Sequence, residues 1–287
     1  MVIIGFFVRF RGVRKHRKPN IRTGQSGRST PARGYSMERR KWSRNELIVA
    51  FNLYCKTPFG RIHNRNPEII ALAAALGRTA SAVSWKLANF ARLDPALKKR
   101  NIAGASHGAK LEGQIWNEFA GDWERLSFES EKLRIELLKE PPLAVHEENL
   151  PEGRSRDAIV RVRINQGFFR SAILATYQSR CCITGLSVPS LLSASHIIPW
   201  SVDVKNRTNP RNGLCLNALH DRAFDCGLIT VTSEYKVLVS PRLKKVRDRA
   251  IEAFIRPYDG ATIEVPQHFQ PEVPFLKYHE ENVYCRA

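Results

Sequence analysis

The sequence predicts an α+β protein with a helical first part and a mixed second part. Capped, apolar helical patterns follow one another over residues 41–138. Residues 158–287 instead combine short apolar strand patterns, polar loops and short helices. Residues 139–157, between the two parts, are rich in proline and charge and have no hydrophobic periodicity, which is typical of a linker. We therefore expect two domains joined at 139–157.

Three helix starts define the first part. Ser43 with Glu46 three residues later forms a capping box, in which both side chains satisfy N–H groups at a helix start. Asn66 followed by Pro67 gives a second start, because proline tolerates the first helical position. Thr79 caps a third helix, which follows a turn that contains glycine. This order predicts a helix-turn-helix-like unit.

The charge of the chain indicates a polyanionic partner. Lys and Arg number 46 against 27 Asp and Glu, which gives a net charge of +19. So large an excess attracts nucleic acid and slows self-association. The first 37 residues contain no acidic residue and lack periodicity. We interpret residues 1–40 as a disordered basic arm, a transit peptide, or translated sequence upstream of a true start at Met37.

The cysteine content and the apolar runs argue against a disulfide-stabilised protein and against a membrane-spanning protein. Six cysteines are few for 287 residues and do not resemble a disulfide framework. The only apolar run near the start, MVIIGFFV, is too short to span a membrane and has its positive charge after it. We expect a cytoplasmic protein without a membrane partner.

The third helix of the first part is a candidate DNA contact. It could place four polar side chains near a phosphate backbone or in a major groove, while its apolar face packs inward. A helical bundle with a solvated charged face has the same pattern, and the net charge favours DNA. The candidate residues are Arg78, Thr79, Ser81 and Lys86.

The second part contains a cluster of residues that can do chemistry. His196 lies in or beside a predicted strand, Asn212 at the entrance to a helix, and His220 on that helix. The texts ASHIIPW, NGL and LHDRAFD around them resemble the HNH nuclease motif, a β-hairpin and helix on one divalent metal ion (the ββα-metal fold). CCITG before and FDCGLITV after strengthen the resemblance. In the first part, the texts KWSRNELIVAFNLYCKTPFGRIH and GRTASAVSWKLANFARLDP resemble the N-terminal region of bacterial restriction-type HNH endonucleases.

This resemblance implies a role for each residue of the cluster. His196 would be the general base, because a neutral imidazole can take a proton from water at physiological pH. Asn212 would hold the connecting loop so that His196 keeps its orientation. His220 would bind the metal ion, Mg²⁺ or another divalent ion such as Mn²⁺. The chain would then be a DNA endonuclease for restriction or defence, producing 5′-phosphate and 3′-hydroxyl ends.

One position departs from the family pattern. Many HNH nucleases have an acidic residue or histidine directly before the base as a metal ligand, and this chain has Ser195. A hydroxyl is a poor substitute for a carboxylate toward a hard cation. The metal ion then relies on His220, water and phosphate, or Asp221 or Asp225 contributes, or activity is weak or absent. Asp225 can also serve the backbone at the helix end. A non-catalytic DNA-binding regulator on a decayed HNH scaffold is therefore the alternative function.

The remaining residues of the second part allow weaker expectations. A structural zinc module is disfavoured because the cysteines lack the two-residue spacing of such sites, so we interpret them as buried thiols. The basic loop could contact phosphates, although a solvated loop has the same composition. Cutting both strands with one active site per chain would favour a homodimer. The cysteines are Cys181, Cys182, Cys215 and Cys226, and the loop residues are Lys205, Arg207, Arg211 and Arg222.

Overall fold

The structure is a computed structural model that describes residues 40–99, 110–138 and 156–285. The predicted basic arm at 1–40 and the predicted linker at 139–157 lie almost entirely outside these residues. Contacts divide the chain into residues Met1–Lys41 and a second compact unit, Trp42–Ala287. This second unit contains all the predicted site residues.

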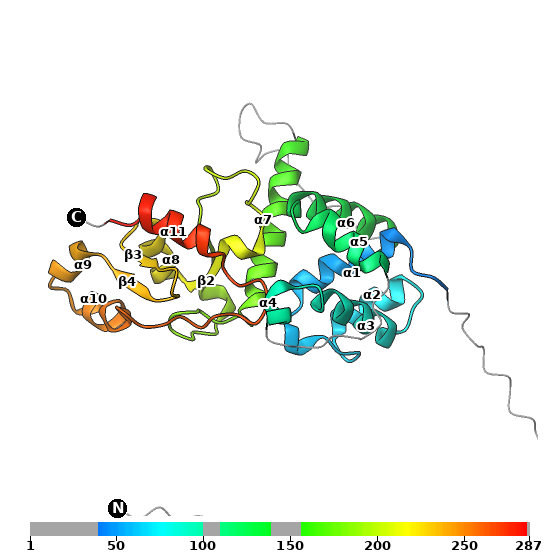
Figure 1. The fold of residues 1–287 in the computed structure, drawn as a ribbon, viewed down its shortest axis with the longest axis horizontal. Coiled ribbons are helices and arrows are strands. Elements are labelled where there is room, and N and C mark those ends of the chain that lie inside the picture. The colour runs from blue at the N-terminus through cyan, green and yellow to red at the C-terminus, as the bar shows by residue number, and fades with distance from the viewer. Residues whose placement is uncertain (1–39, 100–109, 139–155, 286–287) are drawn as a thin grey trace, which may run out of the picture. The chain divides into compact units, whose positions relative to one another are not determined.

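The first part of this unit is helical, as predicted (Figure 1). The capping box at Ser43 is present in both directions, and Asn66 and Thr79 accept hydrogen bonds from the starts of the next helices. Each predicted start is therefore a helix start in the structure. The elements are α1 Arg44–Lys56, η1 Phe59–Arg61, α2 Pro67–Ala75, α3 Ala80–Ala91, α4 Pro95–Lys99, α5 Lys110–Phe119 and α6 Trp123–Leu138.

Helix α1 lies at the centre of the first hydrophobic core. It packs against α3, α5 and α6 and also against α7 (Arg156–Thr176) of the second part. The rings of Phe51 on α1 and Phe90 on α3 stack with centroids 4.7 Å apart. Phe269, from the C-terminal part of the chain, packs its ring edge against Trp123 in the same core. The two parts of the chain therefore share apolar packing.

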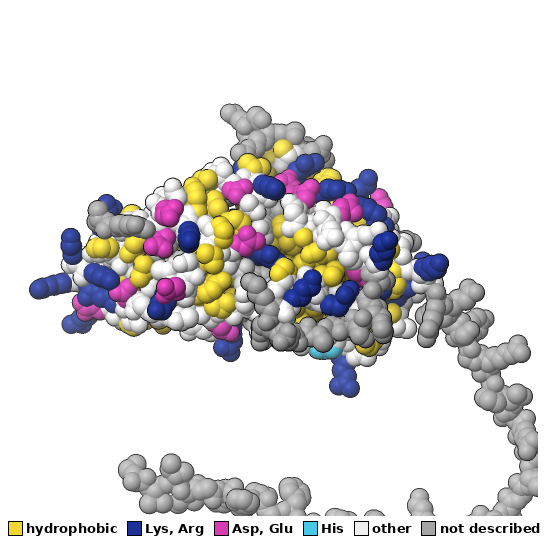
Figure 2. Space-filling model, in the orientation of Figure 1, with side chains coloured by type: hydrophobic (Ala, Val, Ile, Leu, Met, Phe, Trp, Pro, Cys, Tyr) yellow, Lys and Arg dark blue, Asp and Glu magenta, His cyan; other side chains and the backbone are white. Residues whose placement is uncertain are grey.

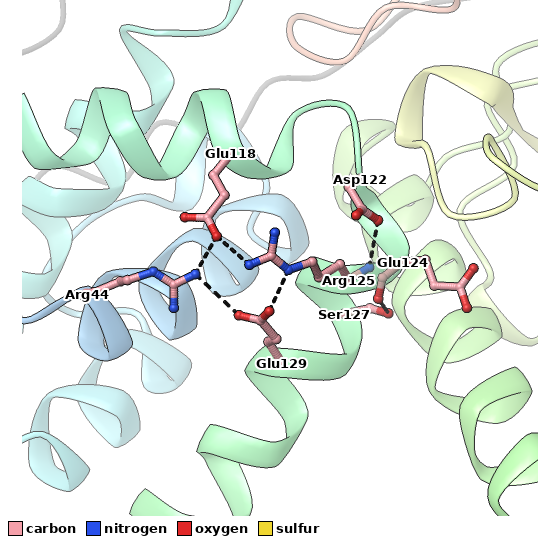
Figure 3. A network of polar contacts seen from close by, with 7 residues as sticks. All are labelled: Arg44, Glu118, Asp122, Glu124, Arg125, Ser127 and Glu129. Carbon is pink, nitrogen blue, oxygen red and sulfur yellow. Dashed lines mark hydrogen bonds and ion pairs between the residues drawn. The ribbon is translucent and has the colours of Figure 1, made fainter.

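A network of ion pairs joins α1, α5 and α6 at the surface (Figure 3). Arg44 on α1 donates to Glu118 and lies 3.6 Å from Glu129. Arg125 contacts the same two carboxylates at 2.5 Å and 2.6 Å. The hydrogen bond from Arg44 lowers the pKa of Glu118 below its usual value. Because these side chains are partly exposed, each pair contributes at most about 1 kcal/mol.

The second part contains two β-hairpins and surrounding helices (Figure 1). In the first hairpin β1 and β2 are antiparallel, with Leu192 opposite Asn217 and His196 opposite Gly213. In the second hairpin β3 and β4 are antiparallel, with Ile229 opposite Val239. The elements are α7 Arg156–Thr176, η3 Pro189–Leu191, β1 Leu192–His196, η4 Pro210–Asn212, β2 Gly213–Asn217, α8 Ala218–Asp225, β3 Ile229–Val231, β4 Val237–Val239, α9 Pro241–Lys245, α10 Arg249–Phe254, η5 Arg256–Tyr258 and α11 Val273–Asn282.

The predicted α+β class is confirmed by this arrangement of a helical region followed by a mixed region. A second hydrophobic core surrounds the first hairpin and includes Phe169 and Ile173 of α7 and Phe224 of α8. In the described part of the chain, no helix combines the length and the apolar character needed to cross a membrane.

Candidate active site

Strand β1 and helices α7 and α8 line a cavity of about 550 Å³. Five polar side chains at its wall are relevant to chemistry: Arg170, Ser195, His196, Asp221 and Asp225. They come from three elements because β1, β2 and α8 follow one another in the chain while α7 packs on the hairpin. The structure thus forms the β-hairpin and helix that the resemblance implied.

His196 is held by three neighbours at the end of β1. Its Nε2 lies 2.8 Å from the carbonyl oxygen of Arg207. Its ring stacks on Phe169 at 3.8 Å between centroids and meets Trp200 edge-on at 5.5 Å. Since a carbonyl only accepts, Nε2 carries the proton and Nδ1 carries the lone pair. Among the described residues, Nδ1 has no hydrogen-bond partner.

The protonation state of His196 suits a base. Burial lowers its pKa below the ordinary 6.5, although the hydrogen bond to the Arg207 carbonyl and the charge of Asp221 oppose the shift. The imidazole is therefore neutral at pH 7 and has a lone pair available for a proton.

Asn212 closes the loop that connects β1 to β2. Its side chain is fully buried and makes three hydrogen bonds. The amide oxygen accepts from Ile198 N at 2.8 Å, and the amide nitrogen donates to the carbonyls of Ile198 and Asn206 at 3.2 Å each. These bonds fix both ends of the loop that carries Arg207, the residue whose carbonyl orients His196. The predicted positioning role of Asn212 is thus consistent with its contacts.

Gly213, opposite His196 in the hairpin, allows α7 to approach closely. A Cβ at this position would lie 2.4 Å from Cδ1 of Ile173 and 2.7 Å from Cζ of Phe169. Any larger residue would therefore push away the ring on which His196 stacks.

Asp221 and Asp225 present two carboxylates to the cavity from successive turns of α8. Burial raises the pKa of Asp225, the charge of Asp221 raises it further, and Arg222 opposes these effects. Two carboxylates that repel each other would be stabilised by a cation between them. Ser195 adds a buried hydroxyl that has no hydrogen-bond partner within the described residues. Such an oxygen set suits a hard divalent ion, of which Mg²⁺ needs only one or two carboxylates besides water and phosphate.

His220 does not line this cavity. Its side chain is 2% exposed, its Nε2 lies 2.9 Å from the carbonyl oxygen of Phe254, and its Nδ1 lies 2.8 Å from the amide nitrogen of Asn217. Asn217 caps α8 with its oxygen, so its amide nitrogen faces Nδ1 as a donor. Both ring nitrogens are therefore engaged, and neither offers a lone pair to a metal ion in this arrangement. The structure thus places His196 at the cavity wall and His220 away from it.

The sequence reasoning missed the cavity residues that α7 contributes. Arg170 and Gln166 lie four positions apart on α7, and both line the cavity with Phe169. Arg170 donates to the carbonyls of Leu192 at 2.9 Å and Pro189 at 3.3 Å, which fixes its guanidinium beside β1. The spacing of Gln166, Phe169 and Arg170 on one helix face was the available signal.

The predicted DNA contacts of the first part have different environments. Arg78 forms an ion pair with Glu46 at 2.9 Å, and its side chain is only 8% exposed. Lys86 contacts the buried Glu112 at 2.5 Å. Arg78 and Lys86 therefore neutralise internal carboxylates and lie over the ring of Trp42, while Thr79 and Ser81 are exposed at the start of α3.

The basic loop also divides into two groups. Lys205 and Arg222 are exposed. Arg207 donates to the Trp200 carbonyl at 2.6 Å. Arg211 lies 3.8 Å from the buried Asp94 and 3.5 Å from Glu272. Arg207 and Arg211 thus hold the loop, and of these four cations Lys205 and Arg222 are open to a phosphate.

The predicted buried thiols are confirmed for Cys181, Cys182 and Cys215. The expectation was wrong for Cys226, which is exposed because it follows the last residue of α8 at the solvent side. Within the described residues, no group of three His, Cys, Asp or Glu side chains is arranged to hold a metal ion. A cation in the cavity would therefore need water or phosphate oxygens as further ligands.

The comparison with protein families bears on this region directly. Residues 181–232, from the turn before β1 to the strand after α8, match the family model described as HNH endonuclease. This segment is similar to an HNH domain. The resemblance found in the sequence is thereby confirmed for the segment that contains His196, Asn212 and His220. No curated protein matches the chain. The match relates residues 181–232 to a family of nucleases and DNA-binding proteins.

Proposed function

We propose that this chain is a divalent-metal-dependent DNA endonuclease of the restriction or defence type. The observation that carries the proposal is one cavity that holds a neutral histidine with a free Nδ1 and two neighbouring carboxylates. His196 is the proposed base. The metal-holding role moves from His220 to Asp221 and Asp225, because both nitrogens of His220 are engaged.

Each residue has a distinct task in this proposal. Nδ1 of His196 takes the proton from the water that attacks the phosphorus, and the bond from Nε2 to the Arg207 carbonyl holds the ring and its tautomer. Arg170 binds a non-bridging phosphate oxygen, since its guanidinium is already oriented by two carbonyls. Asp221 and Asp225 would hold a divalent ion, which would supply charge neutralisation at the phosphate and stabilise the departing 3′ oxygen.

A supercoiled-plasmid assay tests the proposal with Mg²⁺, with Mn²⁺ and with EDTA. We expect cutting with either metal ion and none with EDTA. His196→Ala should lower the rate about 10²- to 10⁴-fold without changing the metal concentration required. Asp221→Asn or Asp225→Asn should raise that concentration, whereas Glu281→Gln, on the exposed surface of α11, should match the parent. All variants should retain DNA binding.

Three outcomes would contradict the proposal. DNA binding without cutting under every metal condition would identify a non-catalytic regulator on a decayed HNH scaffold. That alternative is suggested by Ser195, which stands where many HNH nucleases have a metal ligand. Tightly held zinc in the purified protein would identify a structural zinc module. Full activity of His196→Ala would remove the proposed base.

A further inference from the structure

Basic residues are concentrated in α9, at the start of α10 and in the segment between these helices. Five of the eight residues at 242–249 are basic, and all five are exposed or partly exposed. We name this segment the basic turn; its basic residues are Arg242, Lys244, Lys245, Arg247 and Arg249. Figure 2 shows Lys and Arg side chains gathered at the end of the molecule that α9 and α10 form.

Few carboxylates neutralise the basic turn. Lys244 pairs with Asp259 at 2.5 Å. The nearest acidic residue in sequence, Asp248, uses its carboxylate to cap α10 through two backbone N–H groups. The side chains of Lys245, Arg247 and Arg249 form neither a hydrogen bond nor an ion pair with the described residues. Three positive charges thus lie close together in sequence on one exposed turn, where they repel one another.

The backbone of the basic turn is fixed before any ligand binds. Nη2 of Arg256 donates to the carbonyls of Lys244 at 3.0 Å, Leu243 at 3.3 Å and Val246. Leu243 is also buried in the second core. A preordered turn loses little conformational entropy on binding, which favours a ligand that meets several cations at once.

The basic turn is also attached to the helix of the HNH domain. The carbonyl of Phe254, the last residue of α10, lies 2.9 Å from Nε2 of His220 on α8. Tyr258, just after α10, packs its ring perpendicular to His220 at 5.3 Å. The cations are therefore connected rigidly to the helix that carries Asp221 and Asp225.

We propose that the basic turn binds the phosphate backbone of duplex DNA, and that Lys245, Arg247 and Arg249 supply the contacts. This inference rests on the proposed function, because it identifies a second surface for the same substrate. Duplex DNA presents about one negative charge per 1.7 Å of its axis. This row of phosphates can contact several neighbouring cations at once, which a single small anion cannot. The contacts carry no sequence information.

An anionic membrane is the competing partner, because Phe254 and Val246 are exposed near the same cations. The helices of the basic turn are too short for this use. Helix α9 has 5 residues and α10 has 6, whereas membrane-surface helices are longer and have a continuous apolar face. The structure therefore favours DNA.

The test compares two triple variants of the full chain. Lys245→Ala/Arg247→Ala/Arg249→Ala removes the proposed phosphate-binding side chains. Lys132→Ala/Arg180→Ala/Lys236→Ala removes the same charge from positions elsewhere on the surface. Binding to a duplex of about three helical turns is measured by fluorescence anisotropy in EDTA over a range of NaCl. Log affinity falls with log salt concentration, and the first variant should reduce the steepness of this fall by about 2.7, or about 0.9 for each phosphate that is no longer neutralised. The second variant should change the steepness much less.

Equal slopes for the two triple variants would overturn the inference and leave the basic turn a solvated surface. Weaker binding to phosphatidylglycerol vesicles with unchanged DNA binding would also overturn it, in favour of a membrane. Plasmid cleavage separates these results from the proposed function. A protein that binds DNA through the basic turn but never cuts supports the inference and contradicts the endonuclease. A protein that cuts with an unchanged salt slope does the reverse.

Discussion

The imidazole of His196 lies parallel to the ring of Phe169, with an interplanar angle of 9°. The two residues are far apart in sequence and meet because α7 packs on the first hairpin. Together with the Arg207 carbonyl, this stack leaves the ring one orientation, in which Nδ1 is the only nitrogen without a protein partner among the described residues. The orientation of the proposed base therefore depends on a helix outside the matched HNH segment.

Replacing Phe169 should accordingly impair cleavage more than folding. Phe169→Leu keeps an apolar side chain but removes the stacking surface, so we expect single-turnover cleavage to fall at least about tenfold while DNA affinity is retained. Phe168→Leu is the matched control, because Phe168 is equally buried but packs in the first core. Equal loss of cleavage in both variants, measured well below their melting temperatures, would contradict a specific role for the stack.

Replacing Asn212 should destabilise the protein and slow cleavage together. Asn212→Ala leaves the N–H and carbonyl of Ile198 and the carbonyl of Asn206 without their partner, and each unsatisfied buried group costs about 1–3 kcal/mol. Urea unfolding measures the loss of stability. Asn282→Ala removes a single hydrogen bond at the exposed end of α11 and serves as the control. An Asn212 variant as stable as this control would show that the loop is held by other contacts.

Stability should decline on acidification because of two buried histidines. Burial lowers the pKa of His268 and of His279 to about 4. The pKa of each histidine in the folded protein is thus below the unfolded value of 6.5. Between these two values the unfolded chain binds more protons than the folded one, so the free energy of unfolding decreases as the pH is lowered from about 6.5 to about 4. At about pH 5 each histidine should cost about 2 kcal/mol relative to about pH 7.5.

Denaturant unfolding at both pH values checks this prediction. His268 is the sharper case, because both of its ring nitrogens are buried without a partner in the described chain. His268→Leu should therefore remove about half of the pH effect. An unaltered difference between the two pH values in this variant would assign the acid sensitivity to other groups.

The sequence allowed correct prediction of features whose causes are local. Ser43, Asn66 and Thr79 cap helices because the partner N–H groups lie two or three residues away. The hairpins follow from apolar runs on either side of polar segments. Contacts between distant residues were not predictable in this way. In the sequence Arg78 is indistinguishable from a DNA contact, because its ion pair with Glu46 becomes visible only in the structure. Arg170 lines the cavity only because α7 packs on the first hairpin.

The position of His220 illustrates a different limit. Asn217 sets the residue at which α8 begins, and the rotation of about 100° per residue then decides which side chains face the cavity. His220 and Phe224 fall on the buried face, whereas Asp221 and Asp225 fall on the cavity face. A shift of one residue in the start of the helix exchanges these faces, and motif spacing alone does not fix it.

Arg78 should act on stability and not on DNA binding. From the sequence alone, Arg78 and Lys86 were candidate DNA contacts. From the structure we expect Arg78→Ala to lower the free energy of unfolding by about 3–5 kcal/mol, because the buried carboxylate of Glu46 loses the positive charge that neutralises it. Arg65→Ala, nearby and exposed, should change stability by less than about 0.5 kcal/mol. If Arg78→Ala is instead stable and its DNA affinity depends less steeply on salt concentration, Arg78 contacts DNA.

His220→Gln distinguishes a structural histidine from a metal ligand. In the structure the ring joins α8 to α10 through Phe254 and accepts from Asn217. We therefore expect the substitution to lower the melting temperature and to reduce cleavage by loosening α8, and we expect no recovery with excess Mn²⁺. Asp221→Asn should behave in the opposite way, with near-parent stability and activity that returns as Mn²⁺ is raised, because only a ligand is removed. If Mn²⁺ instead rescues His220→Gln and leaves Asp221→Asn inactive, the ligand is the histidine and α8 must turn to bring it to the cavity.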